Sequence, residues 1–230
     1  MSLVLGVLGG MGPAATLEFL ARLQAYTPAE REEDHIRVLA DINPRGLEGP
    51  PGVGPGPGLA EMAGALRGAG ADVLAIPCNT AHLHADLIQR ASGLPLIDMI
   101  GLGAEAASRS GAMRAGVLGA KGALKLYREY LAARAMGLVT LSPERQADFM
   151  ATLARIKGGE RGPLIRREMQ GYAEDLAHAG AEVLIAGCTE APLVLSPAEV
   201  RIEWVDPGDL LARRAVAVCL GWEPLPAPPG

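Results

Sequence analysis

The chain has 230 residues, of which 49% are hydrophobic and 20% charged, and its formal net charge is −5. These values are typical of a globular protein and exclude a disordered chain or a coiled coil, and the negative charge gives no reason to expect nucleic acid or an anionic membrane as partner. No basic residue precedes the first apolar run, so we expect no secretory signal, and the apolar runs are too short to span a bilayer. The three cysteines, an odd number, together with the absence of a signal favour a reducing cytoplasm over a disulfide framework.

Strand-like and helix-like segments alternate along the first part of the chain. Apolar runs at residues 2–10, 36–43, 72–77 and 94–98 predict strands, and residues 15–26, 59–70 and 81–92 predict helices. Strands without a polar face that alternate with helices indicate an α/β fold, with a parallel sheet flanked by helices. Residues 49–58, GPPGVGPGPG, predict a loop because neither a helix nor a strand tolerates so much Gly and Pro.

The second half of the chain repeats the plan of the first. Residues 6–9 (GVLG) recur at 116–119, and the GADVL of residues 70–74 recurs as GAEVL at 180–184, so both matches have the same offset in sequence. Residues 96–98 and 204–206 match at a slightly shorter offset. We therefore expect two similar α/β lobes, residues 1–98 and 99–205, related by pseudo-two-fold symmetry and followed by a closing helix within residues 206–222.

Two cysteines follow this repeat and are the candidate catalytic residues. Cys78 and Cys188 are separated by the same offset as the repeated segments, and each lies at the end of a predicted strand, where ligands bind in parallel sheets. Cys219, in the closing helix, predicts only a buried core residue. The pairs Asn79-Thr80 and Thr189-Glu190 are helix-capping types. Each catalytic thiol is therefore expected at a helix N-terminus, where the dipole favours the thiolate.

A thiolate on one side of a substrate carbon and a thiol on the other predict a two-base racemase. One sulfur removes the α-proton and the other returns a proton to the opposite face. Backbone N–H groups at the helix starts, together with Asn79, Thr80 and Thr189, would hold the substrate carboxylate. No cofactor enters this chemistry, and without a CxxC or a close Cys/His cluster we expect no metal site. A single nucleophilic cysteine and a redox-active pair stay open as alternatives.

Other features carry weaker predictions. The turn at residues 9–15 contains a G-x-G-x-x-A pattern typical of dinucleotide binding, but Pro13 removes an N–H from such a cradle. We expect this turn, with Met11 and Gly12, to line the substrate cleft. His82, four residues after Cys78, could form a Cys/His dyad, although a helix surface is the simpler expectation.

Three motifs carry a family resemblance. LGGMGPAAT (8–16), PCNTAH (77–82) and GCTEAPLVL (187–195) resemble the aspartate/glutamate racemases that work without pyridoxal phosphate, and most closely the aspartate racemases. The resemblance covers nearly the whole chain. It implies two α/β lobes with the C-terminal helix returning to the first, catalytic Cys78 and Cys188, a small amino-acid substrate, no cofactor and a homodimer.

The resemblance also implies substrate-binding residues. Asn79 and Thr80 would hold the substrate carboxylate, Lys157 in its IKGG motif would bind the substrate, and Glu190 favours the aspartate branch, since the glutamate branch has His there. The full expected set of substrate-binding residues is Met11, Gly12, Arg45, Asn79, Thr80, Lys157, Thr189 and Glu190.

Two departures from the family pattern concern substrate recognition. After Asn43-Pro44 the family has Ile-Pro-Asp-Arg, whereas this chain has only Arg45, out of register. The family's Thr-Gly-Thr turn is replaced by residues 121–123 (KGA). We predict racemisation of an amino acid, with aspartate as the first candidate. An isomerase or decarboxylase of a small diacid, or an inactive amino-acid-binding protein, are the alternatives.

Overall fold

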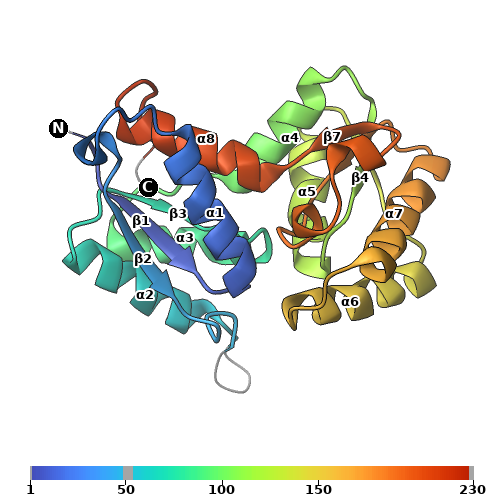
Figure 1. The fold of residues 1–230 in the computed structure, drawn as a ribbon, viewed down its shortest axis with the longest axis horizontal. Coiled ribbons are helices and arrows are strands. Elements are labelled where there is room, and N and C mark those ends of the chain that lie inside the picture. Colours follow the sequence, from blue (N-terminus) through green and yellow to red (C-terminus); the bar gives the residue numbers. More distant parts are fainter. Residues whose placement is uncertain (1, 49–53, 228–230) are drawn as a thin grey trace. The chain divides into compact units, whose positions relative to one another are not determined.

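Two compact units make up the chain, and each is built on its own parallel sheet (Figure 1). The structure, a computed structural model, describes all residues except 1, 49–53 and 228–230. Unit 1 consists of Met1–Met99 with Gly208–Gly230, and unit 2 consists of Ile100–Pro207. Every pair of described strands is parallel, which confirms the predicted α/β class. Among the described residues, no helix combines the length and the apolar character needed to cross a membrane.

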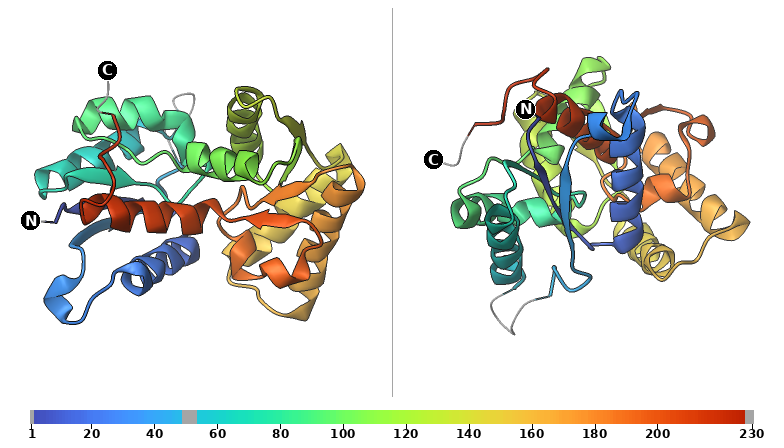
Figure 2. Two further views of the ribbon diagram at one scale, coloured as in Figure 1. Left: turned by 90° about the horizontal axis from the view of Figure 1, so that it is seen from above. Right: turned by 60° about the vertical axis from the view of Figure 1, so that its left-hand side comes forward.

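The sheet of unit 1 has the strand order β2-β1-β3. Its strands are β1 (Leu5–Gly9), β2 (Val38–Ile42) and β3 (Val73–Ala75), and Leu96 adds an isolated parallel bridge to Leu74. Strands β1 and β3 are fully buried, so their sequences are unbroken apolar runs. Helices α2 (Gly56–Gly68) and α3 (Ala85–Ser92) cover one face, and α1 (Pro13–Tyr26) and α8 (Pro207–Cys219) cover the other (Figure 2).

The sheet of unit 2 repeats this order and adds one strand, giving β5-β4-β6-β7. Its strands are β4 (Arg114–Val117), β5 (Gly137–Val139), β6 (Val183–Ile185) and β7 (Glu203–Val205). Its helices are α4 (Met99–Arg109), α5 (Lys121–Ala132), α6 (Pro143–Lys157) and α7 (Pro163–His178). In unit 1, β1 lies between β2 and β3, and in unit 2, β4 lies between β5 and β6. Strands β3 and β6, which precede Cys78 and Cys188, therefore occupy equivalent places in the two sheets.

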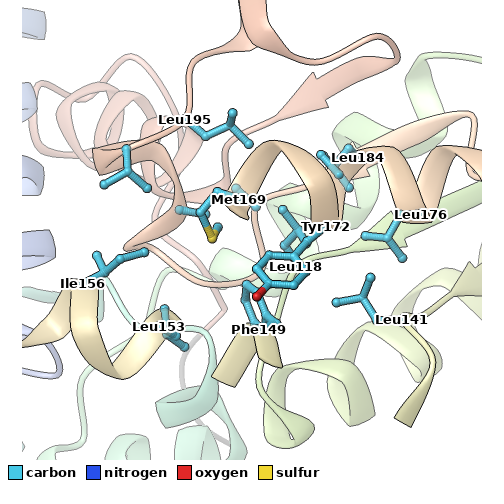
Figure 3. Packing of buried hydrophobic residues seen from close by; sticks show 14 of the residues in the cluster. Leu118, Leu141, Phe149, Leu153, Ile156, Met169, Tyr172, Leu176, Leu184 and Leu195 are labelled. Carbon is cyan, nitrogen blue, oxygen red and sulfur yellow. The ribbon is translucent and has the colours of Figure 1, made fainter. Parts of the chain in front are cut away.

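Helices α6 and α7 close the core of unit 2 over the sheet (Figure 3). Phe149 of α6 meets Tyr172 of α7 edge to face, with ring centroids 5.6 Å apart. Leu184 of β6 and Leu176 of α7 pack in the same buried cluster. This core fixes the end of α6, where Lys157 lies, relative to the strand that leads to Cys188.

One predicted boundary differs in the structure. Helix α2 begins at Gly56, inside the stretch predicted as a loop, because Pro57 lies in the first turn, where its missing N–H needs no partner. Residues 49–53 of that stretch lie outside the described residues. The described residues also contain four short 3-10 helices: η1 (Glu32–Asp34), η2 (Thr80–His84), η3 (Ala191–Leu193) and η4 (Pro197–Glu199).

Helix α8 is attached to unit 1 at both of its ends. The N–H of Leu3 donates to the carbonyl of Cys219 at 2.9 Å, and the hydroxyl of Tyr26 in α1 bonds to the carboxylate of Asp209. Arg213 stacks on the Tyr26 ring, with its guanidinium carbon 4.0 Å from the ring centroid. The last helix of the chain is therefore part of the unit that contains Cys78.

Candidate active site

The turn between β1 and α1 is held by one buried threonine. The hydroxyl of Thr16 accepts from the N–H of Gly10 at 2.9 Å and donates to the carbonyl of Gly12 at 3.1 Å. Gly10 has φ +94°, and a Cβ there would lie 2.4 Å from the backbone of Asn43. The sequence interpretation did not single out Thr16. Its position four residues after Gly12, in the first turn of a helix, was the available signal.

Met11 joins this turn to the loop that carries Arg45. A Cβ at Gly46 would lie 3.1 Å from the Met11 sulfur, so the methionine side chain lies against that loop. The side chain of Asn43 accepts from the backbone N–H of Arg45 at 2.9 Å, which shapes the loop. The Arg45 side chain itself is exposed. Three expected residues, Met11, Gly12 and Arg45, thus lie on adjacent loops at the carboxyl ends of β1 and β2.

Cys78 follows β3 and is 7% exposed. It belongs to the same buried cluster as Met11, so the structure brings these two expected residues together. Asn79, which is buried, and Thr80 follow directly and begin η2. The expected side-chain cap is wrong: Asn79 has a helical backbone (φ −59°, ψ −44°) and its side chain makes no capping bond. A capping side chain needs an extended backbone, and the five residues of η2 give only a short dipole.

His82 is buried, and the expectation of a helix-surface histidine is wrong. Its Nε2 accepts from the N–H of Met99 at 3.3 Å, so Nδ1 carries the proton and donates to the carbonyl of Cys78 at 3.0 Å. Burial lowers the pKa of the His82 ring, although its bond to Cys78 and the charge of Asp98 oppose this. The ring therefore ties the end of β3 to the start of α4 through a bond to the main chain of Cys78.

Cys188 follows β6 and forms a side-chain hydrogen bond with a residue two positions along the chain. Its thiol donates to Oε2 of Glu190 at 2.8 Å. Burial, and then the adjacent Glu190 carboxylate, raise the pKa of the Cys188 thiol well above its ordinary value. These effects oppose the small stabilisation of the thiolate that a helix N-terminus is expected to give at this position. The reason is physical: η3 has only three residues, so its dipole is small, whereas a full negative charge lies next to the sulfur.

Glu190 and Lys157 form a pair behind Cys188. The Glu190 side chain is 3% exposed, and its Oε1 lies 3.8 Å from the Lys157 ammonium nitrogen. Lys157 ends α6 and its side chain is 42% exposed. Thr189 lies between Cys188 and Glu190 in the chain and is partly exposed. The structure thus brings Cys188, Glu190 and Lys157 together from two separate segments of unit 2.

A surface pocket of about 490 Å³ lies beside the N-terminus of α5. Lys121 in this pocket corresponds to Met11 in the internal repeat and lies at the equivalent turn of the second unit. The side-chain amide of Gln146 donates to the carbonyl of Gly119 at 3.0 Å and fixes α6 against this turn. The sequence interpretation missed Gln146, which no motif marks. The residues that line the pocket are Ala120, Lys121, Gly122, Pro143, Gln146, Ala147 and Met150.

Comparison with known proteins identifies a family and several similar proteins. The model of the Asp/Glu/hydantoin racemase family matches residues 8–215. The broad specificity amino-acid racemase RacX of Bacillus subtilis (strain 168) is 24% identical over 229 residues, which is 96% of this chain and 100% of RacX. A glutamate racemase of Synechococcus sp. (strain CC9605) is 31% identical over 179 residues, 74% of this chain but only 64% of that protein.

Solved structures agree with the fold. The aspartate racemase of Picrophilus torridus superposes with a TM-score of 0.80 at 21% identity, covering 97% of this chain and 96% of its own. A putative Asp/Glu racemase of Yersinia pestis gives a TM-score of 0.79 at 21% identity, with 95% of this chain and 99% of that one covered. At these identities the likeness establishes the two-lobed α/β fold.

Proposed function

The chain belongs to the Asp/Glu/hydantoin racemase family, whose members are isomerases, and we propose that it racemises an amino acid without a cofactor by a two-base thiol mechanism. Cys78 and Cys188 act on opposite faces of the substrate α-carbon. A thiolate of one cysteine takes the α-proton, and the electron pair of the broken C–H bond stays on the substrate. The thiol of the other cysteine then gives its proton to the opposite face, which inverts the configuration.

One observation carries this proposal. Cys78 and Cys188 follow β3 and β6, which hold the same position in the strand order of their two sheets. A single nucleophilic cysteine would leave the second copy without a role. Each cysteine also lies at the carboxyl end of a parallel strand, where this class of sheet binds its ligands.

The residues around the cysteines would hold the substrate carboxylate. Asn79 and Thr80 follow Cys78, and Thr189 follows Cys188, each at the start of a short helix. Together with Met11 and Gly12 on the first turn, they supply N–H and side-chain donors for the negative charge that develops when the α-proton leaves. Donors of this kind lower the barrier to carbanion formation by acting only where charge appears.

Aspartate is the first candidate substrate, with Arg45, Lys157 and Glu190 forming its side-chain site. A second candidate class, neutral amino acids, is favoured by the contact between Lys157 and Glu190, since a lysine already paired with a carboxylate attracts a substrate carboxylate less. The broad specificity that the name of RacX records points in the same direction.

Deuterium incorporation tests the function and the substrate together. Each enantiomer of aspartate, glutamate, alanine and lysine is incubated with the protein in D₂O, and loss of the α-proton signal is followed by NMR. We expect exchange with inversion, fastest for aspartate; faster exchange of alanine selects the neutral class, and exchange of lysine faster than of both would contradict both candidates. Absence of exchange with every amino acid would refute the racemase proposal, and a rise in melting temperature without exchange would indicate a binding protein.

Cysteine variants test the mechanism. Cys78→Ala and Cys188→Ala each remove one of the two acid–base groups, and we expect each to lower racemisation by a factor on the order of 10³ or more. Cys219→Ala is the matched control, because Cys219 is buried in α8 and has no proposed part in the reaction. Full two-way turnover by either of the first two variants would exclude the two-base mechanism.

A further inference from the structure

The contact between Cys188 and Glu190 places a proton in the active site. A carboxylate oxygen and a thiolate sulfur are both acceptors, so they do not approach each other closely unless one of them carries hydrogen. The Cys188 sulfur and Oε2 of Glu190 are 2.8 Å apart. One proton therefore lies between these two atoms.

The proton belongs to the sulfur. A carboxylic acid has an ordinary pKa of about 4.3 and a thiol one of about 8.5, so sulfur holds the shared proton more tightly by about four units. The Lys157 ammonium nitrogen lies 3.8 Å from Oε1, on the side of the carboxylate away from the sulfur contact at Oε2. Oε1 is buried and accepts no hydrogen bond from any described residue. Among the described residues, the Lys157 ammonium is therefore the group that offsets the burial of this oxygen.

We propose that Cys188 is the protonated member of the resting pair, so that Cys78 removes the substrate α-hydrogen and Cys188 protonates the opposite face in the first turnover. This assignment rests on the two-base function proposed above. In that step the α-proton moves to the Cys78 sulfur, and the thiol proton of Cys188 moves to carbon. The step leaves a Cys188 thiolate beside the Glu190 carboxylate, which is unfavourable and drives recovery of a proton at Cys188.

Charged and titratable groups lie near both cysteine segments. Cys188 faces the Glu190 carboxylate on its own segment and the Lys157 ammonium at the end of α6. On the Cys78 side, the His82 ring bonds to the main-chain carbonyl of Cys78; burial lowers the pKa of that ring, and the charge of Asp98 opposes this lowering. Glu190 thus sets the resting protonation through its negative charge at Cys188.

The pH dependence of alkylation measures the protonation of each sulfur separately. Wild-type protein is treated with iodoacetamide between pH 6 and 10, and the alkylation rates at Cys78 and Cys188 are read by peptide mass spectrometry. We expect the midpoint of the Cys188 profile to lie at least about one pH unit above that of Cys78. Poor access lowers a rate at every pH alike, so it does not move the midpoint. Equal midpoints, or a lower midpoint for Cys188, would overturn the proposal.

Glu190→Gln supplies the second measurement. Gln fills the same space without the charge, so the Cys188 midpoint should fall by about one unit and its alkylation rate at pH 7.5 should rise about tenfold. The control is Glu174→Gln, which removes an exposed carboxylate of α7 that lies 4.0 Å from Arg201. An unchanged Cys188 midpoint in Glu190→Gln contradicts the assignment. If this variant does not fold, the alkylation profiles of Cys78 and Cys188 in the wild type still test the assignment.

Alkylation requires no turnover, so this test and the test of function fail independently. A protein that shows no deuterium exchange but a raised Cys188 midpoint would retain the protonation assignment without the racemase activity. A protein that exchanges α-protons with equal midpoints would retain the activity without this assignment.

Discussion

At the scale of single residues, His82 shows how a buried titratable group joins the site to the stability of unit 1. Both ring nitrogens are used, one toward the Cys78 carbonyl and one toward the Met99 N–H. Burial lowers the pKa of the ring, so the folded protein holds His82 neutral at a pH where the unfolded chain would protonate it. The bond at Cys78 therefore depends on pH.

The sign of this dependence follows from linkage. A histidine whose pKa is lower in the folded state contributes stability that is fully present above its unfolded pKa of about 6.5 and is lost as pH falls below that value. At pH 5.5, about one unit below the unfolded pKa, part of this stability is lost. We expect His82→Gln, which keeps a donor and an acceptor but does not titrate, to lack this part of the acid destabilisation. Urea unfolding at pH 7.5 and 5.5 measures it, and identical pH dependence in both proteins would contradict it.

The ion pair of Lys157 and Glu190 is a second feature at the scale of single residues, and it contributes to the stability of unit 2. Lys157→Met leaves the buried Glu190 carboxylate without its cation. Loss of one partner from a fully buried pair costs about 3–5 kcal/mol, and the 42% exposure of Lys157 reduces the expected loss here to about 1–2 kcal/mol. In a Glu190→Gln background the same substitution should cost much less. Denaturant unfolding of the wild type, Lys157→Met, Glu190→Gln and the double variant gives the coupling free energy between the two side chains.

An exposed ion pair supplies the control for that cycle. Arg166 lies 3.6 Å from Glu199, and its side chain is 58% exposed. We expect Arg166→Met to have no measurable effect, because solvent screens such pairs. Equal losses for Lys157→Met and Arg166→Met would show that the burial of Glu190 does not matter.

At the scale of elements, the turn after β1 depends on a glycine that nothing else replaces. Gly10 combines φ +94° with a Cβ position 2.4 Å from the backbone of Asn43. Gly10→Ala must therefore separate the turn of Met11 from the loop of Arg45, and we expect a loss of about 3 kcal/mol or more from strain and overpacking. Thermal unfolding and the KM of the racemase reaction measure the two effects.

Gly93→Ala is the control for Gly10→Ala, because it introduces the strain of a left-handed backbone without a steric contact. It ends α3 with φ +66°, and no atom lies within 4 Å of a Cβ built there. Gly93→Ala should cost only about 1–2 kcal/mol from the left-handed backbone, with KM unchanged. If both alanine variants lost the same stability, the contact with Asn43 would have no role.

The elements themselves were largely predictable because their signals are local. Apolar runs gave β1, β3 and β6, since strands buried on both faces leave no polar position. The caps after the cysteines were wrong because capping depends on the backbone angles of Asn79 and Glu190, which their identity alone does not determine. The start of α2 was missed because a Pro/Gly-rich stretch was taken as loop throughout, although Pro is acceptable in the first turn of a helix.

At the scale of the whole molecule, the internal repeat predicted more than any single motif. Val73 and Val183, which begin β3 and β6, are separated by the same offset as the repeated segments. The order β2-β1-β3 of unit 1 matches the order β5-β4-β6 within the sheet of unit 2. The contacts of Lys157 with Glu190 and of Gln146 with Gly119 were not predictable in the same way. They join segments whose separation in sequence carries no periodic signal, so only the packing of α6 reveals them.

The two cores predict how a local defect spreads. One buried cluster is drawn from unit 1 and includes Leu8 and Leu74, and another is drawn from unit 2 and includes Phe149 and Leu153. Because each core is assembled within its unit, Phe149→Ala should cost about 3–5 kcal/mol and open unit 2, while the amides of β1 keep their protection. Leu8→Ala should do the reverse.

Hydrogen exchange with mass spectrometry reads both units in one experiment. In Phe149→Ala we expect faster exchange in β4, β6 and α7 and unchanged exchange in β1 and β3 under native conditions. Equal loss of protection in both units would show that they unfold as one cooperative body. Under the proposed chemistry, racemisation falls in either variant, because the reaction uses one cysteine from each unit and a defect confined to one unit still removes half of the acid–base pair.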